Sequence, residues 1–393
     1  MNVLGSGLSA LLGQSKKVAT TSNNIANLGT DGFKAEQTRF VSQDPAAGGG
    51  VRTFQTSQIT QPGFVRQSAN DLDLSISGNG FFAVDSGDGQ VNFTRDGSFA
   101  PDANGDLRNN SGSRLLGFPL DDNGSPIGGN DPQALEPINI SQNAIAAQPT
   151  TEVEFDGNLD AASDPADAGV DFSRSVTVFD STGAEQQLNF EFEASGTNQF
   201  DLTIRDGDGN ALGSQTLEFD TGGQLTTPAD GQVELTGIDF GNGSVPQDIT
   251  VDVSGTTQFS DSFSVQNIDQ NGFGPGTLSS VTIGEDGRVT ASFSNGSEQD
   301  IAQVPLADFA APNKLQPLSG NLFRETENSG PVNLNPPGQG GTGQIRPGSL
   351  EGSNVNLTQE MVNLIESDVA FKAALAAIRT EEEQADSLLD ILS

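Results

Sequence analysis

The 393-residue chain contains no cysteine, histidine, tryptophan or tyrosine. Without cysteine it can form neither a disulfide framework nor a thiolate site. Without cysteine and histidine it lacks Ser-His-Asp and Cys-His nucleophiles and the usual ligands of zinc and haem. The composition does not exclude a catalytic pair of carboxylates. Chance pairs are expected among 53 acidic residues, however, and no Trp or Tyr offers a sugar-stacking platform. The composition predicts no enzyme, and we expect no cofactor and no metal.

Basic residues are scarce as well. The 17 Lys and Arg against 53 Asp and Glu give a formal net charge of −36, which argues against nucleic acid or an anionic membrane surface as a partner. Residues 151–300 hold 27 of the acidic residues and only three arginines, a local balance of −24. A saline habitat and a domain that faces outward in an assembly both account for this charge, and the two interpretations are compatible.

Long apolar runs are missing from the chain. No stretch reaches the roughly 18–20 apolar residues of a transmembrane helix. The segment Met1–Leu12 has no basic leader, so it does not resemble a secretory signal. These features by themselves predict a cytoplasmic protein without membrane insertion.

The two ends of the chain carry residues at alternating spacings of four and three that are mostly apolar, as expected for one stripe of a helix. The N-terminal set is Leu4, Leu8, Leu11, Ser15, Val18, Ser22 and Ile25. The C-terminal set is Leu357, Met361, Leu364, Asp368, Phe371, Leu375, Ile378, Glu382, Ala385, Leu389 and Leu392. We predict helices over about residues 3–28, ending at Gly29, and about 356–392, capped by Asn356. Either each helix packs on the rest of the chain or the two pair, and a short pair would need neighbouring subunits for stability.

Between the ends, short alternating runs separated by Gly-containing turns predict an all-β body of two sandwich-like or barrel-like units. Asp71–Ile76, for example, alternates strictly before the turn Gly78–Gly80. Two Gly-rich stretches, Asp44–Gly50 and Gly330–Gly348, are predicted to link this body to the terminal helices. The predicted order is helix, linker, β body, linker, helix.

Three local strings imitate binding loops. Gly78–Ala83 matches a loose dinucleotide fingerprint, but the residues that follow continue as a strand where a helix is needed. Asp206–Asn210 and Asp102–Asp106 open like calcium loops, yet both lack the Gly at the sixth position and the Glu at the twelfth. All three strings are better explained as turns.

The string Ser22–Lys34 closely resembles the N-terminal signature of the flagellar rod and hook axial proteins, in which Asn-Asn-Ile-Ala-Asn is followed two residues later by Thr-x-Gly-Phe-Lys. The matching residues, interpreted as a polymerisation signature, are Asn23, Asn24, Ile25, Ala26, Asn27, Thr30, Gly32, Phe33 and Lys34. Leu72–Phe82, Phe93–Phe99 and Ser353–Ile365 resemble further blocks of the same family, in the same order.

The resemblance implies a mainly β fold with a terminal α-helical coiled coil and nested, discontinuous domains. The expected parts are an inner helix with the signature (1–34), a linker or extended segment (35–70), two halves of a β core domain (71–142 and 272–348), an inserted acidic outer β domain (143–271) and the C-terminal helix (349–393). The implied coiled-coil seam comprises Leu4, Leu8, Leu11, Val18, Ile25, Leu357, Met361, Leu364, Phe371, Leu375, Ile378 and Leu389.

Rod proteins of this family lack a large inserted domain, so the insertion favours a hook subunit. Such a subunit would self-assemble into a flexible tubular universal joint that transmits motor torque. The implied partners are further copies of the chain, the rod, hook-cap and hook–filament junction proteins, and the flagellar export apparatus. The implied location is the extracellular hook, reached without a cleaved signal, and it replaces the cytoplasmic expectation. The alternatives are a distal-rod or other basal-body axial subunit and, from another class, a secreted β-sandwich adhesin.

Overall fold

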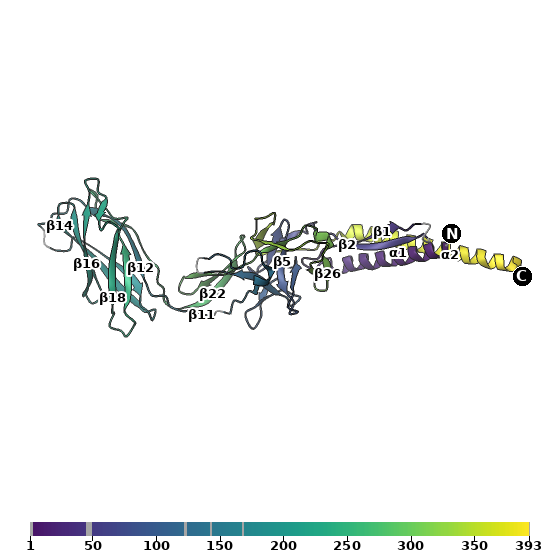
Figure 1. The fold of residues 1–393 in the computed structure, drawn as a ribbon, viewed down its shortest axis with the longest axis horizontal. Helices are drawn as coiled ribbons and strands as arrows, with labels where there is room; N and C mark the ends of the chain where they lie inside the picture. Colours follow the sequence, from purple (N-terminus) through teal and green to yellow (C-terminus); the bar gives the residue numbers. More distant parts are fainter. Residues whose placement is uncertain (1–2, 45–48, 122–123, 142–143, 167–168, 393) are drawn as a thin grey trace. The chain divides into compact units, whose positions relative to one another are not determined.

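The computed structural model describes residues 3–44, 49–121, 124–141, 144–166 and 169–392 (Figure 1). The chain forms two compact units. Unit 1 comprises Met1–Ser141, Ser280–Ala291 and Gln299–Ser393, and unit 2 comprises Gln142–Ser279 and Ser292–Glu298. The predicted fold class, mainly β with a helix at each end of the chain and the two helices paired, is confirmed. Within the described ranges, no helix is both long and apolar enough to cross a membrane.

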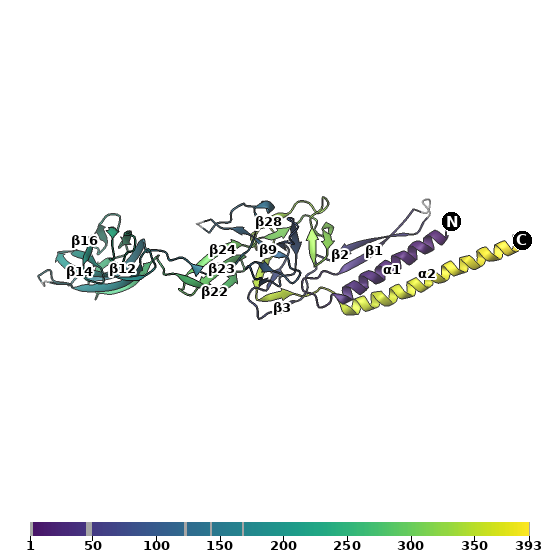
Figure 2. The same ribbon diagram turned by 90° about the horizontal axis from the view of Figure 1, so that it is seen from below.

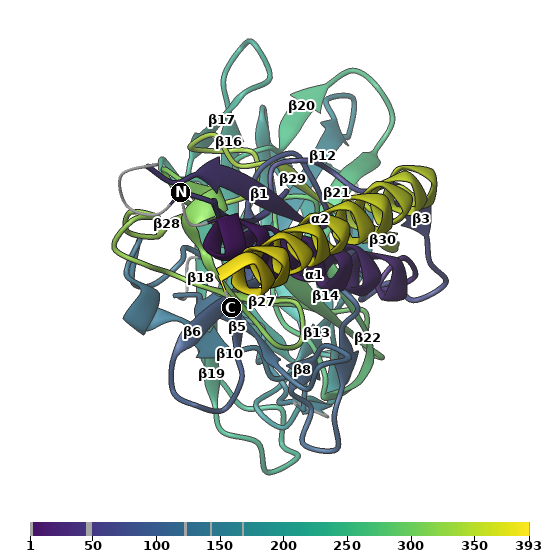
Figure 3. The same ribbon diagram turned by 90° about the vertical axis from the view of Figure 1, so that its right-hand side faces the viewer.

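Unit 1 contains the two helices, α1 (Val3–Ala26) and α2 (Leu357–Leu392), which lie side by side (Figures 2 and 3). Asn356 caps α2 as predicted, because its Oδ1 accepts a hydrogen bond from the Gln359 N–H at 3.2 Å. Lys17 of α1 and Glu366 of α2 form an ion pair at 3.7 Å across the two helices. An exposed pair of this kind adds little stability, so other contacts must hold the helices together.

A β-hairpin of β1 (Glu36–Ser42) and β2 (Val51–Ser57) lies along α1 (Figure 2). The hydroxyls of Thr20 and Thr38 share a hydrogen bond of 2.8 Å between helix and hairpin. Gly13 lets the hairpin come close, since a Cβ at this position would lie 2.7 Å from the ring of Phe40. The helix module is therefore built from three elements, two helices and a hairpin.

Both predicted linkers differ from the structure. Asp44–Gly50 joins the two strands of the hairpin and does not separate α1 from the β body; its residues 45–48 lie outside the described ranges. Within Gly330–Gly348, β28 (Asn333–Asn335) and β29 (Gln344–Pro347) pair with strands of the body. The Gly-rich composition misled the prediction because strand pairing uses backbone groups, which polar and small residues supply as well as apolar ones.

The β body of unit 1 is buried on both faces of its central strand. Phe81 and Phe82 are consecutive in β5 (Phe81–Asp85) and point to opposite faces. Phe82 packs in one apolar cluster, with Phe99 and Leu115, and Phe81 packs in another, with Phe309. Two cores on one sheet explain why β5 is apolar without interruption from Phe81 to Val84.

The strands of unit 1 are short and the pairs among them antiparallel. Besides β1, β2, β5, β28 and β29 they are β3 (Val65–Gln67), β4 (Leu74–Ser77), β6 (Val91–Thr94), β7 (Ala100–Pro101), β8 (Leu107–Arg108), β9 (Arg114–Pro119), β10 (Glu136–Pro137), β25 (Leu306–Asp308), β26 (Gln316–Leu318), β27 (Leu322–Arg324) and β30 (Ser349–Glu351). Three strands have residues in both units: β22 (Gly276–Ile283), β23 (Arg288–Phe293) and β24 (Glu298–Gln303).

Unit 2 is a sandwich of two five-stranded sheets. One sheet has the order β18-β19-β12-β20, with β21 also paired to β12, and the other has the order β13-β14-β15-β16-β17. Phe155 of the first sheet stacks on Phe190 of the second, with ring centroids 5.8 Å apart. Along β14, Leu188, Phe190 and Phe192 are buried and alternate with polar residues, which is typical of a strand with one face on the core.

The strands that lie wholly in unit 2 are β11 (Ala144–Ile145), β12 (Glu152–Asp160), β13 (Phe172–Phe179), β14 (Glu185–Gly196), β15 (Gln199–Arg205), β16 (Ala211–Phe219), β17 (Leu225–Thr227), β18 (Gln232–Ile238), β19 (Gln247–Asp252), β20 (Thr257–Phe259) and β21 (Ser264–Gln270). Asp206–Asn210 is the turn between β15 and β16, and the Asp206 carboxylate accepts hydrogen bonds from its own loop. The described residues hold no Asp and Glu cluster that could bind a metal ion.

The acidic surface of unit 2 places like charges directly beside one another. Glu154 of β12 is the register partner of Asp252 on one neighbouring strand and of Asp269 on the other. Adjacent carboxylates on one face of a sheet repel, by roughly 0.2–1 kcal/mol per pair. These two repulsions therefore lower the stability of folded unit 2.

We expect E154Q to raise the free energy of unfolding of unit 2 by about 0.5–1 kcal/mol at low salt, because it removes both repulsions. In about 1 M salt, where charges are screened beyond roughly 3 Å, the gain should disappear. Thermal unfolding at the two salt concentrations measures this. The matched control is E191Q, which loses an ion pair of 2.7 Å with Arg205 and should give no gain. A gain of equal size in both variants would contradict the repulsion.

Candidate functional site

Asn24 of the predicted signature joins three elements. Its side chain is buried, and its Nδ2 donates to the Glu36 carbonyl of β1 at 2.8 Å and to Glu360 Oε1 of α2 at 3.0 Å. Its Oδ1 accepts from the Glu36 N–H at 2.9 Å. The amide thus pairs with the backbone of β1 as a neighbouring strand would. Only an amide side chain supplies the donor and the acceptor that this arrangement uses.

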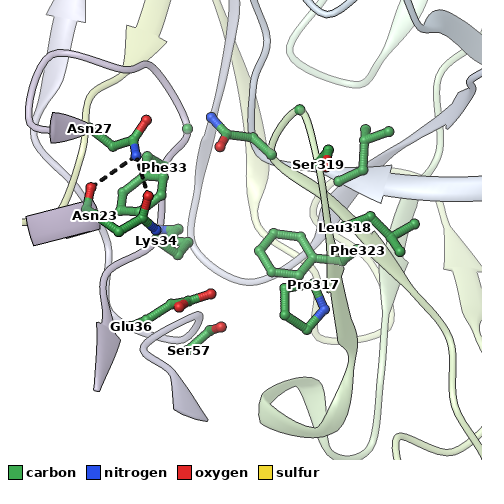
Figure 4. Close-up of a pocket in the computed structure, with 14 residues that line it drawn as sticks. Asn23, Asn27, Phe33, Lys34, Glu36, Ser57, Pro317, Leu318, Ser319 and Phe323 are labelled. Atoms are coloured by element: carbon green, nitrogen blue, oxygen red, sulfur yellow. Dashed lines mark hydrogen bonds between the residues drawn. The ribbon is translucent and has the colours of Figure 1, made fainter. Parts of the chain in front are cut away.

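Other signature residues close the end of α1. Asn27 Nδ2 donates to the Asn23 carbonyl at 2.9 Å (Figure 4). Asn27 Oδ1 accepts from the Thr30 hydroxyl at 3.0 Å. Gly32 has a φ of +69°, and a Cβ there would lie 2.4 Å from the Asp96 backbone nitrogen. Only glycine fits this turn, which brings the chain away from the helix.

The remaining signature residues differ in their burial. Phe33 is buried with Ala35 and Val355 in a small apolar cluster. Ile25 is half-buried and Ala26 is exposed on α1. The sequence predicted all of these residues as one signature, but in the structure they serve different local contacts.

Lys34, the last signature residue, lies in a charge junction that we define as Lys34, Arg95 and Glu351. Lys34 Nζ is 2.6 Å from Glu351 Oε1, and Arg95 Nη1 is 3.1 Å from Glu351 Oε2. The side chains are only 1%, 4% and 1% exposed for Lys34, Arg95 and Glu351. One carboxylate therefore neutralises two cations away from water, and it comes from the strand just before α2.

The charge junction changes the ionisation of its members. Burial alone would raise the pKa of Glu351, but the charges of Arg95 and Lys34 outweigh it and hold this pKa below its ordinary value of 4.5. Burial lowers the pKa values of Lys34 and Arg95. With two cations beside it, Glu351 stays ionised in the folded protein.

A cavity of about 590 Å³ lies between the signature and the β26–β27 hairpin (Figure 4). Asn23, Asn27, Lys34 and Glu36 line one side, and the segment Pro317–Phe323 lines the other. Burial raises the pKa of Glu36. Glu36 is the carboxylate among the described lining residues.

The monomer brings together only part of the predicted seam. Leu11, Val18, Ile25, Leu364, Leu375 and Ile378 are half-buried, whereas Leu8, Leu357, Met361 and Phe371 are exposed. The side chains of Leu4 and Leu389 lie outside the described residues. Of the described helix side chains, the most buried are instead polar: Thr20, Thr21, Asn24 and Ser367.

Apolar side chains that the sequence analysis did not assign to the seam are among the most exposed on the helices. Ile365 is 65%, Val369 60% and Leu12 64% exposed. Together with Leu357 and Met361, the α2 residues recur every four positions, so they are neighbours on one face. A groove of about 560 Å³ between the helices continues this face and is lined by Val18, Leu364, Ile365 and Phe371, among others. The sequence could have indicated this exposed face, because Leu12, Ile365 and Val369 each follow a predicted heptad position.

Known flagellar proteins match this chain along nearly its whole length. The flagella basal body rod protein family matches residues 1–34, the flagellar hook protein FlgE/F/G D1 domain 75–161, the flagellar basal body protein FlaE D2 domain 152–273, and the flagellar basal body rod FlgEFG protein C-terminal family 346–391. The flagellar hook protein FlgE of Brucella suis is 31% identical over 398 residues, which cover 99% of this chain and 98% of the relative. That of Escherichia coli K12 is 32% identical over 389 residues, 94% of each chain. The chain belongs to the flagellar hook protein family.

A solved hook protein structure shares this fold. The crystal structure of the Helicobacter pylori flagellar hook protein FlgE2 matches with a TM-score of 0.54 and covers 72% of this chain and 99% of that one. At 14% identity, this similarity shows the fold alone. Family membership makes the chain a structural subunit of the bacterial flagellar hook, within a structural and not an enzymatic family. Membership of the hook family also replaces the expected cytoplasmic location with the flagellar hook, and the adhesin alternative with a hook subunit.

In this hook protein, Glu351 should make unit 1 sensitive to acid. A carboxylate whose pKa is lowered by folding adds stability above its unfolded pKa, here 4.5, and that stability is lost as the pH falls through the folded value. At neutral pH, E351Q should cost about 3–5 kcal/mol. Denaturant unfolding of both proteins between about pH 7 and pH 3 should show this difference shrinking as the pH falls below about 4.5. A difference that stays constant with pH would refute the assignment.

Replacing Asn24 tests its three-way contact. N24D loses both donated hydrogen bonds and puts a second carboxylate beside Glu360, so it should destabilise the helix module by about 1–3 kcal/mol. The matched control is N23D, which makes the same chemical change one residue earlier, at an exposed position. It should change the free energy of unfolding by about 0.5 kcal/mol or less. Guanidinium unfolding followed by helical circular dichroism compares them. Equal losses would show that Asn24 has no special role.

Proposed function

We propose that this hook subunit self-assembles through the exposed apolar face of the α1–α2 pair into a flexible tube that transmits motor torque to the filament. The observation that carries the proposal is the row of exposed apolar side chains on α2, above all Ile365 and Val369. Apolar faces of this kind on a soluble chain mark contacts with another protein. The occupant is a second copy of the chain, because a helical polymer must bury the same face on every subunit.

The polar interior of the helix pair supports the same interpretation. Thr21, Asn24 and Ser367 are buried within the helix module, so its apolar surface remains available for contacts outside the monomer. A pair of helices whose apolar seam is only half-buried is marginal when isolated. Neighbouring copies would therefore stabilise it, through head-to-tail contacts that do not close into a ring.

The remaining domains would divide the mechanical roles. In this proposal the helices line the tube, the β body of unit 1 forms the shell, and the acidic unit 2 lies outermost. Bending requires outer contacts that slide, and polar, hydrated surfaces allow sliding better than apolar ones. The charge of residues 151–300, −24, is consistent with a hydrated outer layer. The signature Asn23–Lys34 would turn the chain out of the inner layer and contact neighbouring subunits.

The proposal extends to the partners of the hook. The ends of the tube would contact rod, hook-cap and hook–filament junction proteins, and the chain would leave the cell through the flagellar export apparatus without a cleaved signal. It would catalyse no reaction. A chain without cysteine cannot be trapped by disulfides during export, which suits passage in an unfolded state.

A rod subunit is the second candidate, because two of the matching families are described as rod proteins. Electron microscopy of a strain that lacks this chain separates the two functions. Complete rods without hooks are expected. Missing rods would show that the chain builds the rod, and hooks of normal length would show that it builds neither.

The apolar face is tested by I365N and V369N. Each should raise the critical concentration for tube formation by about 10–100-fold, because a buried aliphatic contact is lost, while the unfolding of the monomer is unchanged. The matched control is V245N, at an equally exposed valine of unit 2, 69% exposed, which should leave assembly unaffected. Light scattering and electron microscopy of purified protein measure assembly. Normal tubes from I365N and V369N would exclude this face.

A further inference from the structure

The dipeptide Asn-Gly occurs six times in the chain, beginning at Asn79, Asn104, Asn123, Asn242, Asn271 and Asn295. The first residue of the third pair, Asn123, lies outside the described residues. Asn is thermolabile, and a following glycine has no side chain that would keep its backbone nitrogen away from the Asn side-chain amide. The reaction between the two needs an amide that can rotate towards this nitrogen, so hydrogen bonds that hold the amide slow it.

The three described Asn-Gly pairs of unit 2 are held by their Asn side chains, and Asn271 is held most completely. Its Oδ1 accepts from the N–H groups of Thr151 and Glu152 at 2.9 and 3.1 Å, and its Nδ2 donates to the Thr151 hydroxyl at 2.8 Å. The Gly272 N–H, whose nitrogen would have to attack, donates to Gln270 Oε1 at 2.7 Å. Neither reacting group is free at this pair.

Asn242 and Asn295 are fixed by side-chain hydrogen bonds as well. Asn242 Oδ1 accepts from the Ser244 N–H at 3.0 Å, and its Nδ2 donates to the Asp180 carboxylate. Asn295 is half-buried, and its Nδ2 donates to the Gly274 carbonyl at 2.6 Å. Each bond that has to open before the amide can rotate lowers the reactive population by about two- to tenfold.

The two described pairs of unit 1 lack this protection. Asn79 and Asn104 are exposed, and neither side chain has a hydrogen-bond partner among the described residues. Within the same described part of the chain, the Gly80 N–H has no partner either, and the Gly105 N–H donates to the Asp102 carbonyl at 3.0 Å. The Asn amides are therefore free in unit 1 and held in unit 2.

We propose that Asn79 and Asn104 are sites of spontaneous covalent modification in the folded protein, and that the Asn side chains of unit 2 are protected by their hydrogen bonds. The backbone nitrogen of the following glycine loses its proton and forms a bond to the Asn side-chain carbon. The bond from this carbon to the amide nitrogen breaks and releases ammonia. Water, the co-reactant, then opens the resulting succinimide at one of its two carbonyls and leaves aspartate or isoaspartate.

The modification changes unit 1 in two ways. Each event adds a negative charge at neutral pH. Isoaspartate at Asn79 also lengthens the backbone by one carbon directly before β5, which carries Phe81 and Phe82 of the two apolar clusters. Little room is available for this, since even a Cβ on Gly80 would lie 3.2 Å from the Cβ of Leu306. The reaction needs no assembly, so the proposal does not depend on the proposed function.

Peptide mapping by mass spectrometry tests the proposal on the full-length monomer, aged at mildly alkaline pH in heavy-oxygen water. The label marks acids formed during ageing and excludes those formed during digestion. Asn79 and Asn104 should convert at least about tenfold faster than any of the three described pairs of unit 2. In concentrated guanidinium chloride the chain is unfolded, and the five rates should then agree within about threefold, because every Asn precedes the same unrestrained glycine.

N79Q is the matched variant for the effect on β5. Gln keeps an uncharged amide but would have to close a larger ring, so this position should stay unmodified. After equal ageing, the wild-type protein should unfold at a lower denaturant concentration than N79Q. Equal midpoints would refute the effect on β5. Equal rates in the two units of the folded protein, or a difference between the units that persists in denaturant, would overturn the proposal as a whole.

Discussion

A buried carboxylate, Glu351, is the contact on which the arrangement of unit 1 depends. Both chain ends and the β body meet at it, through Lys34 and Arg95. Buried ion pairs are a weak source of stability compared with apolar packing, but an arrangement that separates the partners leaves a buried charge uncompensated. The junction thus determines where the helix module attaches more than how strongly it is held. Apolar packing, as at Phe81 and Phe82, supplies the stability around it.

The helix module buries some polar side chains more completely than its apolar ones, unlike an ordinary coiled coil. Polar groups such as Asn24 and Ser367 are inside, and aliphatic groups such as Ile365 are outside. In a monomer this leaves part of the apolar surface of the helices exposed. In a polymer the same distribution separates two tasks, since hydrogen bonds define the fold of each subunit and apolar contacts join one subunit to the next.

Long, regular features of this protein could be predicted from its sequence. Both helices follow from heptads over many turns, and the sandwich strands follow from alternation such as Leu188–Phe192. The hairpin Glu36–Ser57 was missed because its connection, Asp44–Gly50, has the composition of a linker. Turn composition indicates where a chain bends and gives no information on what the flanking strands pack against.

Parts of the candidate site depend on contacts between distant segments, which no local pattern encodes. Glu351 is one of 53 acidic residues, and its neighbours in the sequence do not distinguish it. The signature predicted that Asn24 matters, but its hydrogen bonds to Glu36 and Glu360 required the folded chain. The seam prediction could not say which face the monomer buries, because apolar residues next to the heptad positions form a second stripe.

The amide of Asn24 has a consequence for the elasticity of the tube. Its three hydrogen bonds are satisfied at one axial position of α1 relative to β1 and α2, and a shift by one turn, about 5.4 Å, would break all of them. The two helices of one subunit therefore cannot slide past each other as the joint bends. Sliding of α1 against β1 and α2 is therefore excluded as a source of the compliance that the proposed joint needs.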